Sequence, residues 1–189
     1  MTTPATRRGL LLGALAMPFL APALARAQEP NVRAPSHRRN ISSFVTHRWQ
    51  DHFATLGKGV IVADLTSRAV HFWSGDGLEY RIYPSSVPMS DELTRTGFTE
   101  VVRKRVGPDW TPTANMIAWD PSLHYMPPGP DNPLGTHALY LTWPAYLIHG
   151  TQDTRKIGRP SSSGCVGLYN EHIEELYALA PIGTQVRLL

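Results

Sequence analysis

Three short runs of β-branched and aromatic residues lie between residues 59 and 83, and a turn sequence separates each run from the next. The runs cover residues 59–64, 69–73 and 78–83, and the turns are Thr66-Ser67-Arg68 and Ser74-Gly75-Asp76-Gly77. Strands with such brief connections pair as antiparallel neighbours, because a short turn returns the chain alongside itself. The pattern predicts a three-stranded antiparallel sheet, and therefore a fold built mainly from β-structure.

The rest of the chain adds candidate strands and two candidate helices around a proline-rich middle. Further β-rich runs cover residues 99–106, 138–141, 145–148 and 185–189, the last of which is expected to close the sheet. Apolar spacing predicts a helix over residues 42–56, and a second one over residues 171–179 follows Asn170, a favoured N-cap residue. Nine prolines between residues 84 and 133 predict a loop-rich segment. The predicted class is mainly β with short helices (α+β).

The N-terminus has the composition of a secretory signal peptide. Arg7 and Arg8 precede an apolar stretch, and Ala25-Arg26-Ala27 matches a signal peptidase site, so we expect cleavage after Ala27. The paired arginines also suit the twin-arginine export route. We therefore expect the mature protein in the periplasm.

Removing the leader leaves a chain of ordinary domain size with no net charge. The full 189 residues hold 18 Lys and Arg against 15 Asp and Glu, and the leader holds three of the arginines and no acid. This balance argues against a nucleic-acid partner. No segment after the leader is long and apolar enough to span a membrane. We predict a signal peptide over residues 1–27, a spacer and helix over 28–57, and one domain over 58–189.

A single cysteine, Cys165, lies in a loop of small residues sixteen positions after His149. One cysteine cannot form an internal disulfide, and a free thiol is only a few per cent ionised at neutral pH unless a base assists it. His149, at the end of a predicted strand, is the candidate base. Backbone amides around Gly164 and Cys165 are candidate donors to an oxyanion, and Ser163 leaves the thiol accessible.

This arrangement resembles the L,D-transpeptidases with a YkuD-type catalytic domain. The motif is His149-Gly150-Thr151 followed by Ser162-Ser163-Gly164-Cys165-Val166-Gly167. The resemblance covers residues 59–189. It implies a YkuD-like β-sandwich with a catalytic loop between the last strands.

The resemblance also implies a reaction and a set of site residues. Cys165 would attack an L-centre of a peptidoglycan stem peptide to form a thioester, and an amine of a second stem would resolve it, with His149 as base. Gly164, Ser163, Gly150 and Tyr140 are the expected oxyanion and substrate-binding residues. The expected partners are donor and acceptor stems, with no cofactor and no metal.

Two positions depart from the family pattern and bear on the linkage. Gly167 stands where the family commonly has arginine, and His137 stands where relatives often have another arginine. The default product is a 3-3 cross-link. Together with the proline-rich segment, these departures favour a 1-3 linkage between L-alanine and diaminopimelate, because a guanidinium that binds a substrate carboxylate would be missing.

Other interpretations remain open at the level of sequence. A sortase would need a later catalytic arginine, and Arg187 is the sole arginine after Cys165. A wall-binding module without turnover would not need Cys165 and His149. A zinc site from His124, His137, His149 and Cys165 matches no compact ligand motif.

Further polar residues have less specific interpretations. Asp131, Asp153 or a backbone carbonyl is expected to orient His149. His47, His52 and His172 are expected to lie on solvated helix faces.

Overall fold

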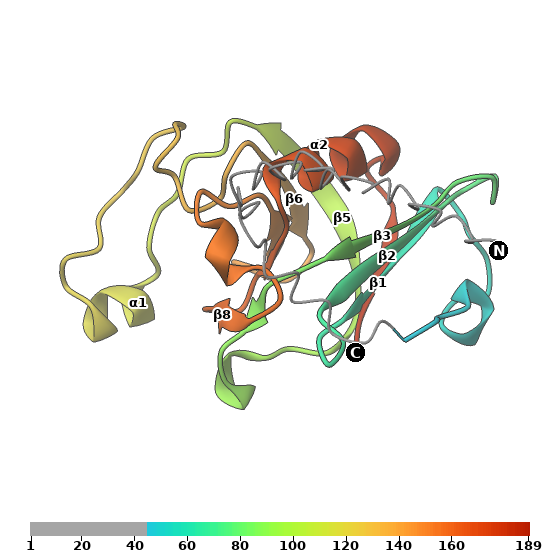
Figure 1. The fold of residues 1–189 in the computed structure, drawn as a ribbon, viewed down its shortest axis with the longest axis horizontal. Helices are drawn as coiled ribbons and strands as arrows, with labels where there is room; N and C mark the ends of the chain where they lie inside the picture. Colours follow the sequence, from blue (N-terminus) through green and yellow to red (C-terminus); the bar gives the residue numbers. More distant parts are fainter. Residues whose placement is uncertain (1–44) are drawn as a thin grey trace, which may run out of the picture. The chain divides into compact units, whose positions relative to one another are not determined.

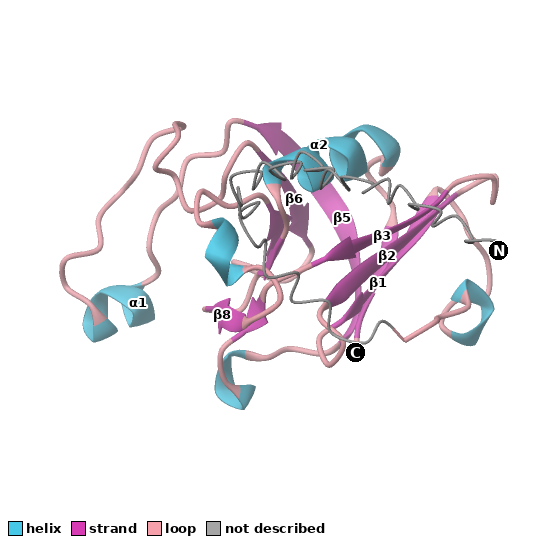
Figure 2. Ribbon diagram, in the orientation of Figure 1, coloured by secondary structure: helices cyan, strands magenta, loops and turns pink. Residues whose placement is uncertain are grey.

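The computed structural model describes residues 45–189, so the predicted leader and spacer and the start of the predicted first helix lie outside the described residues. The strands are β1 (Gly59–Asp64), β2 (Ala69–Ser74), β3 (Tyr80–Pro84), β4 (Val87–Pro88), β5 (Gly97–Val106), β6 (His137–Leu141), β7 (Leu147–His149), β8 (Pro160–Ser162), β9 (Val166–Gly167) and β10 (Gln185–Leu188). The helices are α1 (Ala114–Trp119), α2 (Asn170–Leu179) and the 3-10 turns η1 (Trp49–Asp51), η2 (Asp91–Leu93) and η3 (Thr154–Lys156). Strands dominate this part of the chain, which confirms the predicted class (Figures 1 and 2).

Eight strands pair in the order β3-β2-β1-β10-β5-β6-β7-β9, and β4 pairs with β8. The first three strands are antiparallel neighbours, as their short turns predict. The last strand, β10, lies in the middle of the sheet, parallel to β1 and antiparallel to β5. It therefore joins the two halves of the domain rather than closing an edge.

Strand β5 belongs to both halves because its register shifts between Val101 and Arg103. Its first residues pair with β10 and its later residues pair with β6. Figure 1 shows β1, β2 and β3 running at an angle to β5 and β6. Apolar side chains of both halves meet in one core, with Phe72 from the first half and Ile148 from the second fully buried. Each such side chain stabilises the fold by about 1.5–3 kcal/mol.

Helix α2 covers the core with Ile173 and Leu176, which lie three residues apart and are fully buried. The prediction that Asn170 caps this helix is wrong: Tyr169 holds the cap position, and Asn170 is the first helical residue. The Asn170 side chain instead accepts hydrogen bonds from the backbone amides of two loops, at Thr136 and Thr151. No helix among the described residues is long and apolar enough to cross a membrane.

The predicted N-terminal helix is reduced to the turn η1, and the segment around it packs on the outer face of β1. His47 and His52 are not on a solvated face, because His47 bonds both His52 at 3.2 Å and the buried Asp64 at 3.0 Å. His172 is half-buried between two tyrosine rings rather than free in solvent. In each case the histidine contacts residues that are distant in sequence, and the local sequence does not predict these contacts.

The segment between β5 and β6 is loop-rich, as its prolines predict, and contains only α1 (Figure 1). Trp110 and Met126 pair through two backbone hydrogen bonds of 2.8–2.9 Å, which close the loop. The buried Asn132 amide donates to the carbonyls of Pro108, Met126 and Pro127. Specific polar contacts thus hold this irregular segment beside the site.

Candidate active site

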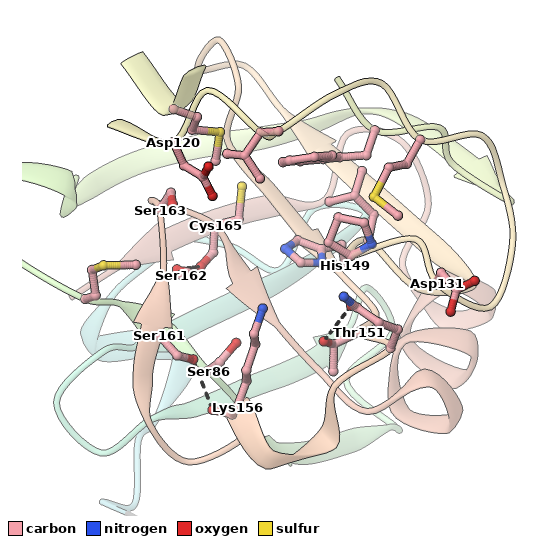
Figure 3. Close-up of a pocket in the computed structure, with 18 of the residues that line it drawn as sticks. Ser86, Asp120, Asp131, His149, Thr151, Lys156, Ser161, Ser162, Ser163 and Cys165 are labelled. Atoms are coloured by element: carbon pink, nitrogen blue, oxygen red, sulfur yellow. Dashed lines mark hydrogen bonds between the residues drawn. The ribbon is translucent and has the colours of Figure 1, made fainter. Parts of the chain in front are cut away.

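A cavity of about 390 Å³ lies where the proline-rich segment meets the ends of β7 and β9. Figure 3 shows Cys165 and His149 in this cavity, with Lys156 reaching into it from η3. Strand β7 runs parallel to β9, which pairs His149 with Gly167. Cys165 directly precedes β9, and both Cys165 and His149 line the cavity. Pairing of these strands therefore brings the two predicted catalytic residues together.

His149 is a buried, neutral imidazole. Its Nδ1 bonds the carbonyl of Gly150, which leaves Nε2 as the free acceptor nitrogen. Burial lowers the pKa of His149 to about 4, and the nearby Lys156 charge acts in the same direction. The orienting group is thus a backbone carbonyl. Asp131 lines the cavity and Asp153 pairs with Arg155, and His149 bonds neither of them.

The loop after His149 is held by Asn170 at the start of α2. The Asn170 Oδ1 atom accepts from the backbone amides of Thr136 and Thr151, each at 3.2 Å. A Cβ at Gly150 would lie 2.3 Å from this oxygen, and one at Gly135 would lie 2.2 Å from it. Gly150 therefore permits close packing against Asn170, and it is not among the residues that line the cavity. The sequence carries no local signal for this contact.

The surroundings of Cys165 favour the protonated thiol over the thiolate. Its Sγ donates to the carbonyl of Ala145 at 3.3 Å, and burial raises its pKa to about 11. Ala145 has φ of 61°, which is strained for a residue with a side chain, and the predicted strand 145–148 accordingly begins only at Leu147. The turn directs the Ala145 carbonyl at the thiol.

The loop before the thiol has its own hydrogen bonds. Ser162 Oγ donates to the carbonyl of Cys165 and accepts from the amide of Gly164 at 3.4 Å. Gly164 has φ of 129°, a conformation that favours glycine. Ser163 lines this cavity and an adjoining one of about 460 Å³, which Met89, Met116 and Trp119 also line.

Several predicted residues lie outside the cavity lining. Tyr140 packs under the Arg103 guanidinium at 3.5 Å from its ring centre. His137 turns toward α2, where its ring lies 4.8 Å from that of Tyr177. Gly167 is buried, and a Cβ there would meet Ser86 Oγ at 2.4 Å.

Two alternative interpretations, a sortase site with a catalytic arginine and a zinc site, can be compared with the structure. Arg187 contacts His52 and Phe98, so it does not supply the arginine that a sortase needs. Among residues 45–189, no group of three or more His, Cys, Asp or Glu side chains is placed to hold a metal ion.

The fold and the cavity define a YkuD-type domain, and comparison with known proteins agrees. The family model described as the L,D-transpeptidase catalytic domain, YkuD, matches residues 58–188. This chain belongs to the L,D-transpeptidase family, as its motif predicts. ORF 5 of the ATP synthase subunits region of Fuscovulum blasticum, whose name assigns it to the L,D-transpeptidases, is 52% identical over 189 residues and 100% of both chains.

More distant relatives share the domain and the fold. YbiS of Escherichia coli K12, named as an L,D-transpeptidase, is 36% identical over 141 residues, which are 71% of this chain and 45% of YbiS. An L,D-transpeptidase structure from Mycobacterium smegmatis has a TM-score of 0.56 at 19% identity, with 70% of this chain and 58% of that chain covered. L,D-transpeptidase 3 of Mycobacterium tuberculosis has a TM-score of 0.55 at 19% identity, with 70% and 61% covered. These two structures support the fold alone.

Proposed function

We propose that this L,D-transpeptidase is cysteine-dependent and transfers a peptidoglycan acyl group through a thioester on Cys165. The observation that carries the proposal is the shared cavity, which the only thiol of the chain and a neutral imidazole both line. A neutral imidazole is the form that can accept a proton. His149 is therefore poised as the base.

The reaction begins with a neutral pair. The raised pKa of Cys165 and the lowered pKa of His149 both disfavour a resting thiolate and imidazolium. As the sulfur bonds to the carbonyl carbon of the L-centre, the thiol proton passes to Nε2 of His149. The amide C–N bond then breaks, and His149 returns that proton to the leaving amine. An amine of a second stem attacks the thioester carbonyl and loses a proton to His149. The C–S bond then breaks, and His149 passes that proton to the sulfur, which restores the thiol.

The donor and acceptor are peptidoglycan stem peptides, and the product we propose is the 3-3 cross-link. The expectation of a 1-3 linkage depends partly on Gly167 and His137, and neither residue lines the cavity. Their departure from the family pattern is therefore weak evidence about which stem peptide serves as the donor. Mass spectrometry of dimers made from purified tetrapeptide muropeptides separates the two linkages: dimers joined through L-alanine would contradict the 3-3 product.

The thioester is tested by intact-protein mass spectrometry. The wild type is expected to gain the acyl mass of the donor, while Cys165→Ala gains none and loses exchange with a fluorescent D-amino acid. His149→Gln should slow acylation by about 10²–10⁴-fold, as expected for loss of a general base. Equal exchange by wild type and Cys165→Ala would remove the cysteine mechanism. No exchange by either would favour a wall-binding module.

We further propose that the protein acts in the periplasm, where its substrate lies. The support is the predicted leader, which lies outside the described residues. Fractionation of cells expressing the full chain should find the processed form outside the cytoplasm. Retention of an unprocessed chain in the cytoplasm would contradict this location.

A further inference from the structure

The charged side chains of the cavity lining are those of Asp120, Asp131 and Lys156, and the lysine has no place in the mechanism above. Lys156, the last residue of η3, is half-buried and lines the cavity beside His149 and Cys165. Figure 3 shows its ammonium group directed into the cavity. It is the only lining residue that carries a positive charge at neutral pH, because His149 is neutral.

The ammonium forms no ion pair with a carboxylate of residues 45–189, although its charge helps to lower the pKa of Asp153. The ion pairs of this part of the chain do not include Lys156. Asp153, the nearest acid along the chain, is held by Arg155 through bonds of 2.8 and 2.9 Å. Partial burial of an unpaired charge is costly, and an anionic ligand would offset that cost.

The backbone beneath Lys156 is well fixed. Its carbonyl accepts from the amide of Arg159 at 3.1 Å and from Ser161 Oγ at 3.3 Å, and the next residue, Ile157, is buried. The Lys156 side chain therefore extends from a fixed backbone position at the edge of the cavity. Such pre-organisation reduces the entropy lost when a ligand is bound.

The proposed substrate carries an anion where it is needed. In the donor stem, the D-residue that leaves is C-terminal, so its free carboxylate lies one residue beyond the amide that breaks. Consecutive Cα atoms are about 3.8 Å apart, so this carboxylate must lie close to the reacting sulfur. Neither Gly167 nor His137 reaches the cavity to bind it.

We propose that Lys156 is a specificity-determining residue that binds the C-terminal carboxylate of the donor stem. This inference rests on the proposed function, since it takes the stem peptide as donor. A lysine binds as a compact point charge, whereas arginine forms a planar fork. The site should therefore require a negative charge at this position and tolerate variation in the D side chain.

The test measures binding in a background that cannot react. Full-length Cys165→Ala is titrated by calorimetry with a tetrapeptide donor stem and with the same stem ending in a C-terminal amide. We expect the carboxylate form to bind at least about 10-fold more tightly, as a charge-assisted contact allows. Adding Lys156→Met should bring the two affinities within about twofold, and Lys156→Arg should retain part of the preference.

Arg159→Met is the matched control, because it removes one positive charge from the same loop outside the cavity lining. It should retain the full preference for the carboxylate. A preference that survives Lys156→Met in a folded variant, checked by circular dichroism, would overturn the inference. An equal loss of affinity for both stems would overturn it too, since that result indicates a structural role.

Kinetics separate this inference from the proposed function. With the otherwise wild-type chain, Lys156→Met should raise KM for the carboxylate donor. Because the Lys156 charge also lowers the pKa of His149, the acid limb of the pH profile of kcat should move toward higher pH. A shifted pH profile with unchanged KM would show that Lys156 acts only through the protonation of His149, against the inference. A wild type that binds stems but forms no thioester would remove the proposed function, while the binding preference still reports on Lys156.

Discussion

At the scale of single residues, the thiol of Cys165 differs most from what its sequence context indicates. A loop of small residues beside a histidine suggests an activated thiolate, yet the thiol donates to Ala145 and burial raises its pKa to about 11. The raised pKa therefore favours the protonated thiol in the free protein. In the proposed mechanism, the thiol would lose its proton only once substrate excludes water and places the carbonyl at the sulfur.

Alkylation by iodoacetamide tests this protonation state. Because the thiolate fraction grows about tenfold per pH unit below the pKa, the rate for the folded protein should rise steadily from pH 7 to 10 without levelling off. The urea-unfolded chain has the same single cysteine and is its own control; its rate should level off above about pH 9. A plateau near pH 7 in the folded protein would contradict a protonated resting thiol.

At the scale of elements, the contact between α2 and the loop after β7 connects the core to the site. Asn170 joins the first turn of α2 to Thr136 and Thr151, next to the His149-Gly150 pair. The site therefore depends on the docking of a helix that contributes no catalytic group. The sequence predicts a polar residue at a helix start as a cap, so the contact that Asn170 makes with the two loops is visible only in the tertiary structure.

Replacing Asn170 tests the contact. Asn170→Ala leaves two backbone amides without their acceptor and should lower the free energy of unfolding by about 2–3 kcal/mol. Asn170→Asp is the matched variant, because its carboxylate accepts both bonds and suits a helix N-terminus; it should cost less than about 1 kcal/mol. Urea unfolding curves measure both values. Equal losses would show that shape, rather than the acceptor, matters here.

At the scale of the whole molecule, buried histidines couple folding to pH. Burial lowers the pKa of both His71 and His149 to about 4. The unfolded chain binds more protons than the folded one between pH 6.5 and 4, so stability is complete above pH 6.5 and is lost as pH falls through this range. The loss approaches about 1.4 kcal/mol per pH unit for each histidine within the window.

Urea unfolding at pH 7 and pH 5 measures this dependence. We expect the free energy of unfolding to fall by about 2–4 kcal/mol over these two pH units. His71→Gln should reduce the difference between the two pH values, whatever its stability at pH 7. His124→Gln changes an exposed histidine and should leave the difference unchanged. A stability that rises on acidification would contradict the neutral state of both buried rings.

The sequence by itself determined the local features of this protein, those that depend on neighbouring residues. The first three strands, the loop-rich middle, the helix near the C-terminus and the family motif all depend on short-range patterns, and the structure and comparisons confirm them. Such patterns can be recognised from the sequence alone, because turn residues, side-chain periodicity and motif spacing each involve only a few neighbouring positions.

Only the tertiary structure decided what each polar side chain does. His47 bonds both Asp64 and His52, and the Asn170 side chain accepts hydrogen bonds from two loops instead of capping its helix. Pairing of β7 with β9 put Cys165 and His149 on the lining of one cavity and left Gly167 buried. These outcomes depend on partners far away in sequence, because a buried polar group must find its hydrogen bond wherever the fold provides one.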